Sequence, residues 1–412
     1  MTEDKFDSRA IHFHAKVLEK QRTERTAAMD KLVTRPDYRP EMAYFVELFR
    51  GDLSLSAVAQ RVGQPVAAIL CVQTPLELLH AFGFHPFKIF GGSYGAGQVV
   101  AHLPALMCPM LRSAIGTLTL ETPPHVPWII PTSCDWVVKF PEMARLNDSA
   151  GDMPVHWMEL PRLKDSPRAR DRWYAEVLAL SDFLGQSRGG CKLSRKTLSR
   201  SIEVFKRARQ SFSRLIALRH AGMVAAPWFS LIANSFFLDR VENWTAALEK
   251  ALPGFNQTVP DNGRIFLAGS PLFFPNFKLL HLLEDAGLYV ADDDLCSSER
   301  IFPVNVAVND TSVEGLLGAL AESYHQGCLC SVFGDSEHRI NNIRAAIPDG
   351  GFKGLVFHVL KGCHPYDLDS FIMESALKET GLRFLRLESD YATEDSQNIL
   401  TRLEAYRRTL GD

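Results

Sequence analysis

The stretch FKGLVFHVLKGCHPYD (352–367) determines how the second half of the chain folds. A short apolar run ends at a cysteine, a helical pattern follows, and a second apolar run, LRFLRLES (382–389), comes next. The first half repeats this order in VPWIIPTSCD (126–135) and VHWMELP (155–161). Short apolar strands that alternate with helices are typical of parallel, doubly wound sheets. The repeat therefore predicts two α/β domains of similar plan.

Further runs extend this pattern on both sides. AAILCV (67–72) and PFKIFGG (86–92) belong to the first half, and RIFLAGS (264–270) and LYVADDDLC (288–296) to the second. In the middle of the chain the pattern changes: apolar residues recur at helical spacing, with dense charges between them. We predict an α/β fold with two Rossmann- or flavodoxin-like parallel-sheet domains. The predicted parts are an N-terminal helical segment (1–60), a first α/β domain (61–161), a helical linker or insert (162–260) and a second α/β domain (261–412).

The composition excludes several classes of protein. The chain has 412 residues, 46% of them hydrophobic, and a formal net charge of -3. This charge gives no electrostatic reason to expect nucleic acid or an anionic membrane as a partner. The most apolar stretch (221–238) is broken by Pro227 and Asn234, which indicates buried core rather than a membrane span. The polar N-terminus is not a secretory signal, so we expect a cytoplasmic protein.

The eight cysteines are the main candidates for chemistry. In a reducing cytosol, stable disulfides are rare, and thiols are more often buried, catalytic or metal-bound. We predict six of them on loops at or after strand ends: Cys108, Cys134, Cys296, Cys328, Cys330 and Cys363. Ligands bind beyond the carboxyl ends of the strands in open α/β sheets, so two facing sheet edges would bring these thiols together. Cys191 is expected to be a bystander, and the role of Cys71 stays open.

The spacing of these thiols alone leaves three interpretations open. Structural zinc usually uses local pairs of cysteines, whereas these residues are scattered along the chain. Iron–sulfur clusters are also bound by thiolates and accept ligands from distant loops. The third reading is a set of unrelated buried thiols.

Other catalytic signatures are weak. The chain has no GxxxxGK[ST] and no GxSxG motif, and GGSYGAG (91–97) indicates a flexible loop rather than a dinucleotide site. His364, beside Cys363, suits a capping role better than that of a proton donor. The acidic run 292–294 is expected to be a solvated turn. No catalytic residue is assigned.

Several segments resemble the 2-hydroxyacyl-CoA dehydratase / benzoyl-CoA reductase superfamily, and within it the double-cubane cluster proteins. The matching segments are CVQTPLELLHAFGFHP (71–86), MCPMLRSAIG (107–116), IIPTSCDWVVKFPEM (129–143), DDLCSSER (293–300), CLCSVFGDSEHR (328–339), KGCHPYD (361–367) and LESDYATEDSQNILTRLEAYRRTL (387–410). The resemblance implies two cluster-binding α/β domains. Cys108, Cys134 and Cys363 would hold a [4Fe–4S] cluster with one iron open for substrate.

The double-cubane branch implies a larger cofactor. With Cys296, Cys328 and Cys330 added, the set would hold an [8Fe–9S] double cubane in each subunit of a homodimer. Electrons would come from a separate ASKHA-type ATPase activator that carries its own [4Fe–4S] cluster. The substrates would be small molecules such as acetylene, azide or hydrazine. The rival expectation is a [4Fe–4S] subunit of a 2-hydroxyacyl-CoA dehydratase, which is a lyase, or of an ATP-dependent benzoyl-CoA reductase. A more distant rival is a non-enzymatic cluster carrier or a zinc-stabilised protein.

Overall fold

The structure, a computed structural model, has the predicted α/β architecture. It describes residues 3–89, 91–98, 103–104, 106–120, 126–145, 154–259, 263–302 and 305–411, and their side chains except those of 3–14, 118–120 and 145. Within these ranges the strands form two separate four-stranded sheets, and helices make up most of the remainder. The predicted fold class is confirmed, while the exact limits of its four parts remain a prediction.

The first sheet is entirely parallel, with the strand order β2-β1-β3-β4. The central β1 (Val66–Ile69) pairs with β2 (His85–Lys88) on one side and with β3 (Trp128–Pro131) on the other. β4 (Val155–Met158) pairs with β3 at the outer edge. The first three strands are buried along their whole length, as expected when helices cover both faces of a sheet.

The second sheet has the same plan. Its order is β6-β5-β7-β8, formed by β5 (Arg264–Gly269), β6 (Tyr289–Asp293), β7 (Gly354–Leu360) and β8 (Arg383–Ser389), and all pairs are parallel. Each sheet therefore has its first strand in the centre, its second on one side, and its third and fourth on the other. The predicted internal repeat is confirmed.

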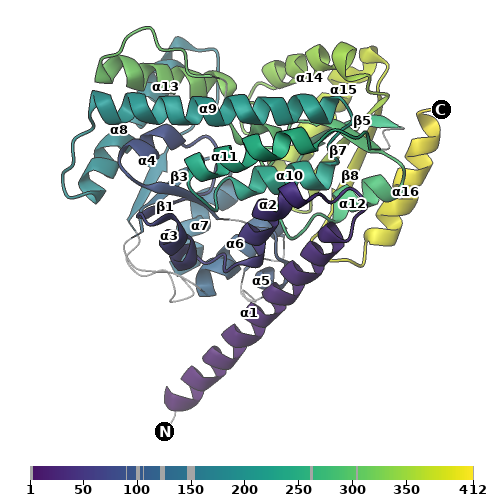
Figure 1. Ribbon diagram of the computed structural model, residues 1–412, viewed down its shortest axis with the longest axis horizontal. Helices are drawn as coiled ribbons and strands as arrows, with labels where there is room; N and C mark the ends of the chain where they lie inside the picture. Colours follow the sequence, from purple (N-terminus) through teal and green to yellow (C-terminus); the bar gives the residue numbers. More distant parts are fainter. Residues whose placement is uncertain are drawn as a thin grey trace.

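Helices enclose and connect the sheets. The long α9 contacts α4 beside the first sheet and β6 of the second, so the helical insert joins the two halves. Figure 1 shows α9 running across both lobes, while α1 extends away from the body toward the N-terminus. The helices are α1 (Glu3–Val33), α2 (Ala43–Arg50), α3 (Leu55–Val62), α4 (Leu76–Ala81), α5 (Tyr94–Gly97), α6 (Pro109–Leu120), α7 (Asp135–Arg145), α8 (Pro167–Ser187), α9 (Arg195–His220), α10 (Ala226–Ser235), α11 (Val241–Ala251), α12 (Lys278–Asp285), α13 (Val313–Gly327), α14 (Glu337–Gly350), α15 (His364–Leu377) and α16 (Ser396–Thr409). Short 3-10 helices lie at Pro40–Met42, Leu252–Gly254, Glu299–Ile301 and Lys378–Thr380.

The apolar stretch in the middle of the chain forms part of the core, as predicted. It contains α10, in which every residue is buried. Each helix in the described ranges is too short or too polar to span a bilayer.

The structure corrects two local predictions. Cys328 and Cys330 follow helix α13 rather than a strand, and Cys108 lies in the loop before α6. The acidic run 292–294 is not a solvated turn, because its three side chains are buried. Sequence alone did not show that buried arginines meet these carboxylates.

Candidate functional site

Three cysteines occupy equivalent positions at helix N-termini. Cys108, Cys134 and Cys363 directly precede α6, α7 and α15, and we call them the three-cysteine group. Backbone N–H groups in the first turn of each helix point at the sulfur and favour its thiolate: those of Met110 and Leu111, of Trp136 and Val137, and of Tyr366. A helix N-terminus carries partial positive charge, so this position suits a thiolate.

Two members of this group come from opposite halves of the chain and touch. The Cys108 and Cys363 thiols share a hydrogen bond, which raises the pKa of Cys108 and lowers that of Cys363. Gly362 makes this approach possible. Its φ is +76°, and a Cβ at this position would lie 2.1 Å from the carbonyl oxygen of Leu106. Only glycine fits both the left-handed backbone and the close contact.

The remaining four cysteines of the site line a cavity of about 40 Å³. They are Cys71, Cys296, Cys328 and Cys330, and we call them the four-cysteine group. Burial and the neighbouring Cys330 and Cys296 raise the pKa of Cys71 to about 12. The structure thus places Cys71, whose role the sequence left open, beside three of the predicted ligands.

The two groups adjoin each other. Burial raises the pKa of Cys134 to about 11, and the neighbouring Cys363 and Cys330 add to this shift. Seven of the eight cysteines therefore form one continuous assembly. Cys191 lies outside it and is exposed, as expected of a bystander.

Buried cations face the four-cysteine group. Lys88 is 2% exposed, and its ammonium lies between the rings of Phe237 and Phe273, 3.5 Å from the carbonyl oxygen of Cys296. Arg300 lines the cavity and donates to the Asp294 carbonyl oxygen. Within the described ranges, neither cation forms an ion pair with a carboxylate.

A third cation, Lys164, holds the loop that carries Cys328. Its ammonium donates to the carbonyl oxygens of Gln326 and Cys328, at 2.8 and 2.6 Å. Burial lowers the pKa of Lys88 and of Lys164, while neighbouring cysteine thiolates oppose that shift. The cysteines are the first source of negative charge that acts on Lys88 and Lys164, whereas Tyr366 and the Asp294 carboxylate act on Arg300 before Cys296 and Cys330 do.

The acidic run holds the Cys296 loop in place. Asp293 pairs with Arg219 of α9 at 2.6 Å and accepts the Leu295 N–H at 2.9 Å. Asp294 pairs with Arg339 of α14, which also pairs with Asp369 of α15. The loop is thereby tied directly to α9 and α14 and, through Arg339, to α15.

The spacing of the sulfurs argues against one zinc ion among the cysteines. With Zn–S bonds of about 2.3 Å, tetrahedral geometry places the sulfurs about 3.8 Å apart. Among the described residues, no three cysteine sulfurs lie within 4.8 Å of one another. A multi-iron cluster is larger than one ion and accepts ligands that are more widely spaced.

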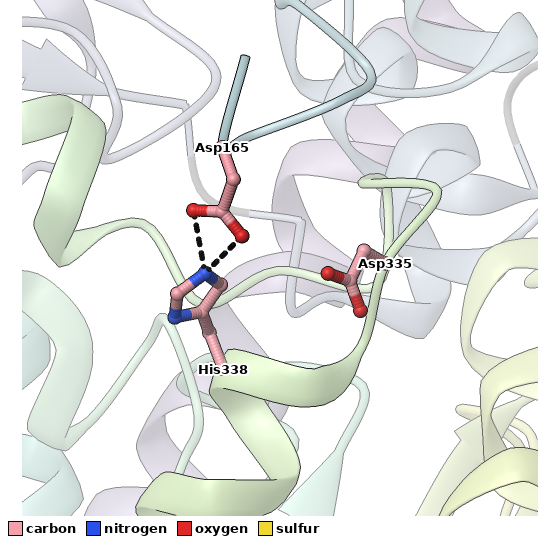
Figure 2. A group of neighbouring side chains, drawn as sticks. All are labelled: Asp165, Asp335 and His338. Atoms are coloured by element: carbon pink, nitrogen blue, oxygen red, sulfur yellow. Dashed lines mark hydrogen bonds and ion pairs between the residues drawn. The ribbon is translucent and has the colours of Figure 1, made fainter.

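Two other groups bring potential metal ligands together. Figure 2 shows the first: His338 is paired with Asp165 at 2.8 Å, and Asp335 lies to one side. The second is His220, Asp292 and Glu299, whose carboxylates also face Arg219. In both groups the charged atoms already have protein partners, so neither rivals the cysteines as the candidate site.

Other sequence candidates have structural roles or none. GGSYGAG is not a flexible loop: Tyr94–Gly97 forms α5, and Gly92 packs so closely that a Cβ there would lie 2.4 Å from the carbonyl oxygen of Phe274. His364 is the first residue of α15 and is exposed.

The model of the family described as 2-hydroxyglutaryl-CoA dehydratase, D-component, matches residues 71–410. The chain belongs to this family. Among its relatives is the Putative dehydratase subunit YjiM of Escherichia coli (strain K12), with 23% identity over 86% of this chain and 94% of the relative. The (R)-phenyllactyl-CoA dehydratase beta subunit of Clostridium sporogenes is 19% identical, with 85% and 93% covered. A benzoyl-CoA reductase subunit of Thauera aromatica is 23% identical, with 84% and 91% covered. The expected superfamily is confirmed, and the family's members are dehydratase and reductase components.

Sequence reasoning did not single out the cations or the tyrosine near these cysteines. Lys88 is a lone charge within an apolar strand, which is a signal for an unusual environment. Tyr391 lies in the family-like segment after β8 and packs against Cys108. Neither role follows from the sequence, because each depends on contacts between distant loops.

Proposed function

We propose that this family member is a reductase component with a double-cubane [8Fe–9S] cluster. In this proposal Cys108, Cys134, Cys296, Cys328, Cys330 and Cys363 are the ligands. A separate ASKHA-type ATPase activator with its own [4Fe–4S] cluster delivers the electrons, and small molecules are reduced. We further propose a cytoplasmic homodimer. The observation that carries the proposal is the gathering of cysteines from both halves into two adjoining groups.

The donor set fits an iron–sulfur group. All six proposed ligands are thiols, helix N–H groups favour thiolates in the three-cysteine group, and the buried Lys88 and Arg300 face the four-cysteine group. When bound, such a cluster supplies single electrons at low potential. The residues around it exclude water, fix the sulfurs and offset their negative charge.

A second candidate is a [4Fe–4S] subunit of a 2-hydroxyacyl-CoA dehydratase or a benzoyl-CoA reductase. The names of the relatives favour it, because they are subunits of such enzymes. The three-cysteine group alone would serve this function. The four-cysteine cavity has no role in it, and for this reason we prefer the double-cubane proposal.

The test is a count of iron and acid-labile sulfide on anaerobically purified protein, with an electron paramagnetic resonance spectrum after reduction. We expect about eight iron and nine sulfide per chain. Cys363→Ser should remove at least half of the iron, whereas Cys191→Ser, at the exposed bystander, should leave the count unchanged. About four of each would favour the second candidate. Zinc alone, or no metal, would contradict both.

A further inference from the structure

Gln73 lies in the loop between β1 and α4, in the first half of the chain, and lines the cavity of the four-cysteine group. The residue is 4% exposed, and its amide nitrogen Nε2 donates a hydrogen bond to the sulfur of Cys328. Its backbone N–H favours the thiolate of Cys71. One residue therefore directs two N–H groups at two sulfurs of this group, one from each half of the chain.

The other end of the same amide has no partner. The Oε1 atom of Gln73 is buried and accepts no hydrogen bond within the described ranges. A buried carbonyl oxygen without a donor destabilises the fold, and an apolar side chain of similar size would avoid this cost. An amide at this position therefore requires an explanation, and the contact of its N–H group with Cys328 provides one.

The loop that carries Gln73 is tied to the helix that precedes Cys328. The hydroxyl of Tyr324, in the last turn of α13, accepts the Leu76 N–H at 2.9 Å and donates to the Glu77 carboxylate at 2.7 Å. α13 ends directly before Cys328. The N–H donor and the sulfur acceptor are therefore held close to each other by contacts of the protein itself.

We propose that Gln73 tunes the electron affinity of the cluster at the four-cysteine group through its N–H contact with Cys328. The inference rests on the proposed function, because it needs iron bound to the Cys328 thiolate. An electron added to such a cluster increases the negative charge on the sulfurs that bind it. An N–H dipole directed at one of these sulfurs stabilises the reduced form more than the oxidised form, so it raises the reduction potential. Gln73 acts through Cys328, as a positioning residue.

The experiment compares Gln73→Leu with the unsubstituted full-length, iron-loaded protein in a redox titration followed by electron paramagnetic resonance. Leucine is of similar size and has no N–H group in its side chain. We expect an unchanged iron count. At the same applied potential, the ratio of reduced to oxidised cluster should be about tenfold lower, which corresponds to about 59 mV for one electron. Gln73→Asn, whose amide is one methylene further from the sulfur, should shift the potential in the same direction.

The matched control is Thr74→Val, in the same loop. Thr74 is fully buried, and its hydroxyl has no hydrogen-bond partner in the described part of the chain. Valine has a closely similar shape, so this variant removes a buried polar group without removing a contact to sulfur, and the reduction potential should not change. The metal-free chains of Gln73→Leu and Thr74→Val should both melt at the temperature of the unsubstituted chain or above it, because each loses an unsatisfied polar atom.

Three results would overturn the inference. An unchanged reduction potential in Gln73→Leu at full iron content would show that the contact does not affect the cluster. An equal shift in Thr74→Val would assign the effect to the polarity of the loop rather than to the N–H group. Loss of iron from both Gln73 variants would make the amide a requirement for cluster assembly instead of a tuning group. Failure of the proposed function is distinguishable, because the unsubstituted protein would then contain about four iron per chain or none.

Discussion

The two cysteine groups differ in how their surroundings compensate negative charge. In the three-cysteine group, N–H dipoles at the starts of α6, α7 and α15 point at the sulfurs. At the four-cysteine group the compensating charges are the buried Lys88, Lys164 and Arg300. Dipoles act within about one helical turn, whereas a buried full charge acts over a longer range. The compensation is therefore local at the three-cysteine group and of longer range at the four-cysteine group.

The groups also differ in what holds them together. The three-cysteine group depends on one close backbone contact, between Gly362 and Leu106. The four-cysteine group depends on buried ion pairs, including Asp294 with Arg339. This difference predicts that one substitution can separate the sulfurs of the first group, while the second responds mainly to changes of charge.

The largest effect is expected for Gly362→Ala. The matched control is Gly381→Ala, because both glycines have a φ of +76° but only Gly362 would bring a Cβ against a neighbour. We expect Gly381→Ala to lower the free energy of unfolding by about 1–2 kcal/mol, and Gly362→Ala by about 2–5 kcal/mol. Urea unfolding of the metal-free chain measures both values. Gly362→Ala should also reduce the iron count, and equal effects of the two substitutions would show that the close contact is unimportant.

A smaller effect is expected for Lys88→Met, which should raise the melting temperature of the metal-free chain but lower the reduction potential of the iron-loaded protein. In the metal-free chain the substitution removes a buried charge without a carboxylate partner, so the melting temperature should rise. In the iron-loaded protein it removes a cation beside the cysteines, so the reduction potential should become more negative. Thermal unfolding and a redox titration measure these changes. Lys206→Met, at an exposed lysine, is the control and should change neither value. An unchanged reduction potential in Lys88→Met would contradict the idea that buried full charges compensate the four-cysteine group.

The smallest effect is expected for Cys71→Ser. With six cysteines as ligands, Cys71 is a neighbour of the cluster, and its loss should leave the iron count near that of the unsubstituted protein. Cys296→Ser, in the same cavity, should lose iron and provides the comparison. Loss of about half of the iron in Cys71→Ser would instead make Cys71 a ligand and give the second group a complete set of four thiolates.

The sequence predicted the regular part of the fold well. The eight strands in the described ranges all lie where short apolar runs were found, and the repeated order of strand, cysteine and helix is visible in the sequence alone. This succeeded because buried parallel strands and amphipathic helices have strong local patterns. It failed at Cys328 and at the acidic run, since the position of a loop and the burial of a carboxylate depend on partners elsewhere, such as Arg219.

By itself, the sequence determined the fold class, the superfamily and which cysteines were candidates. Only the tertiary structure decided how these cysteines divide into two groups. Cys108 contacts Cys363, whereas Cys71 and Cys296 line the four-cysteine cavity. It also decided that Lys88 lacks a carboxylate partner in the described chain and that the Tyr391 hydroxyl is left unsatisfied there. The physical reason is that local patterns record hydrophobic burial along one segment. Distances between sulfurs, and the charges that face them, arise only when loops from two separate sheets are packed against each other.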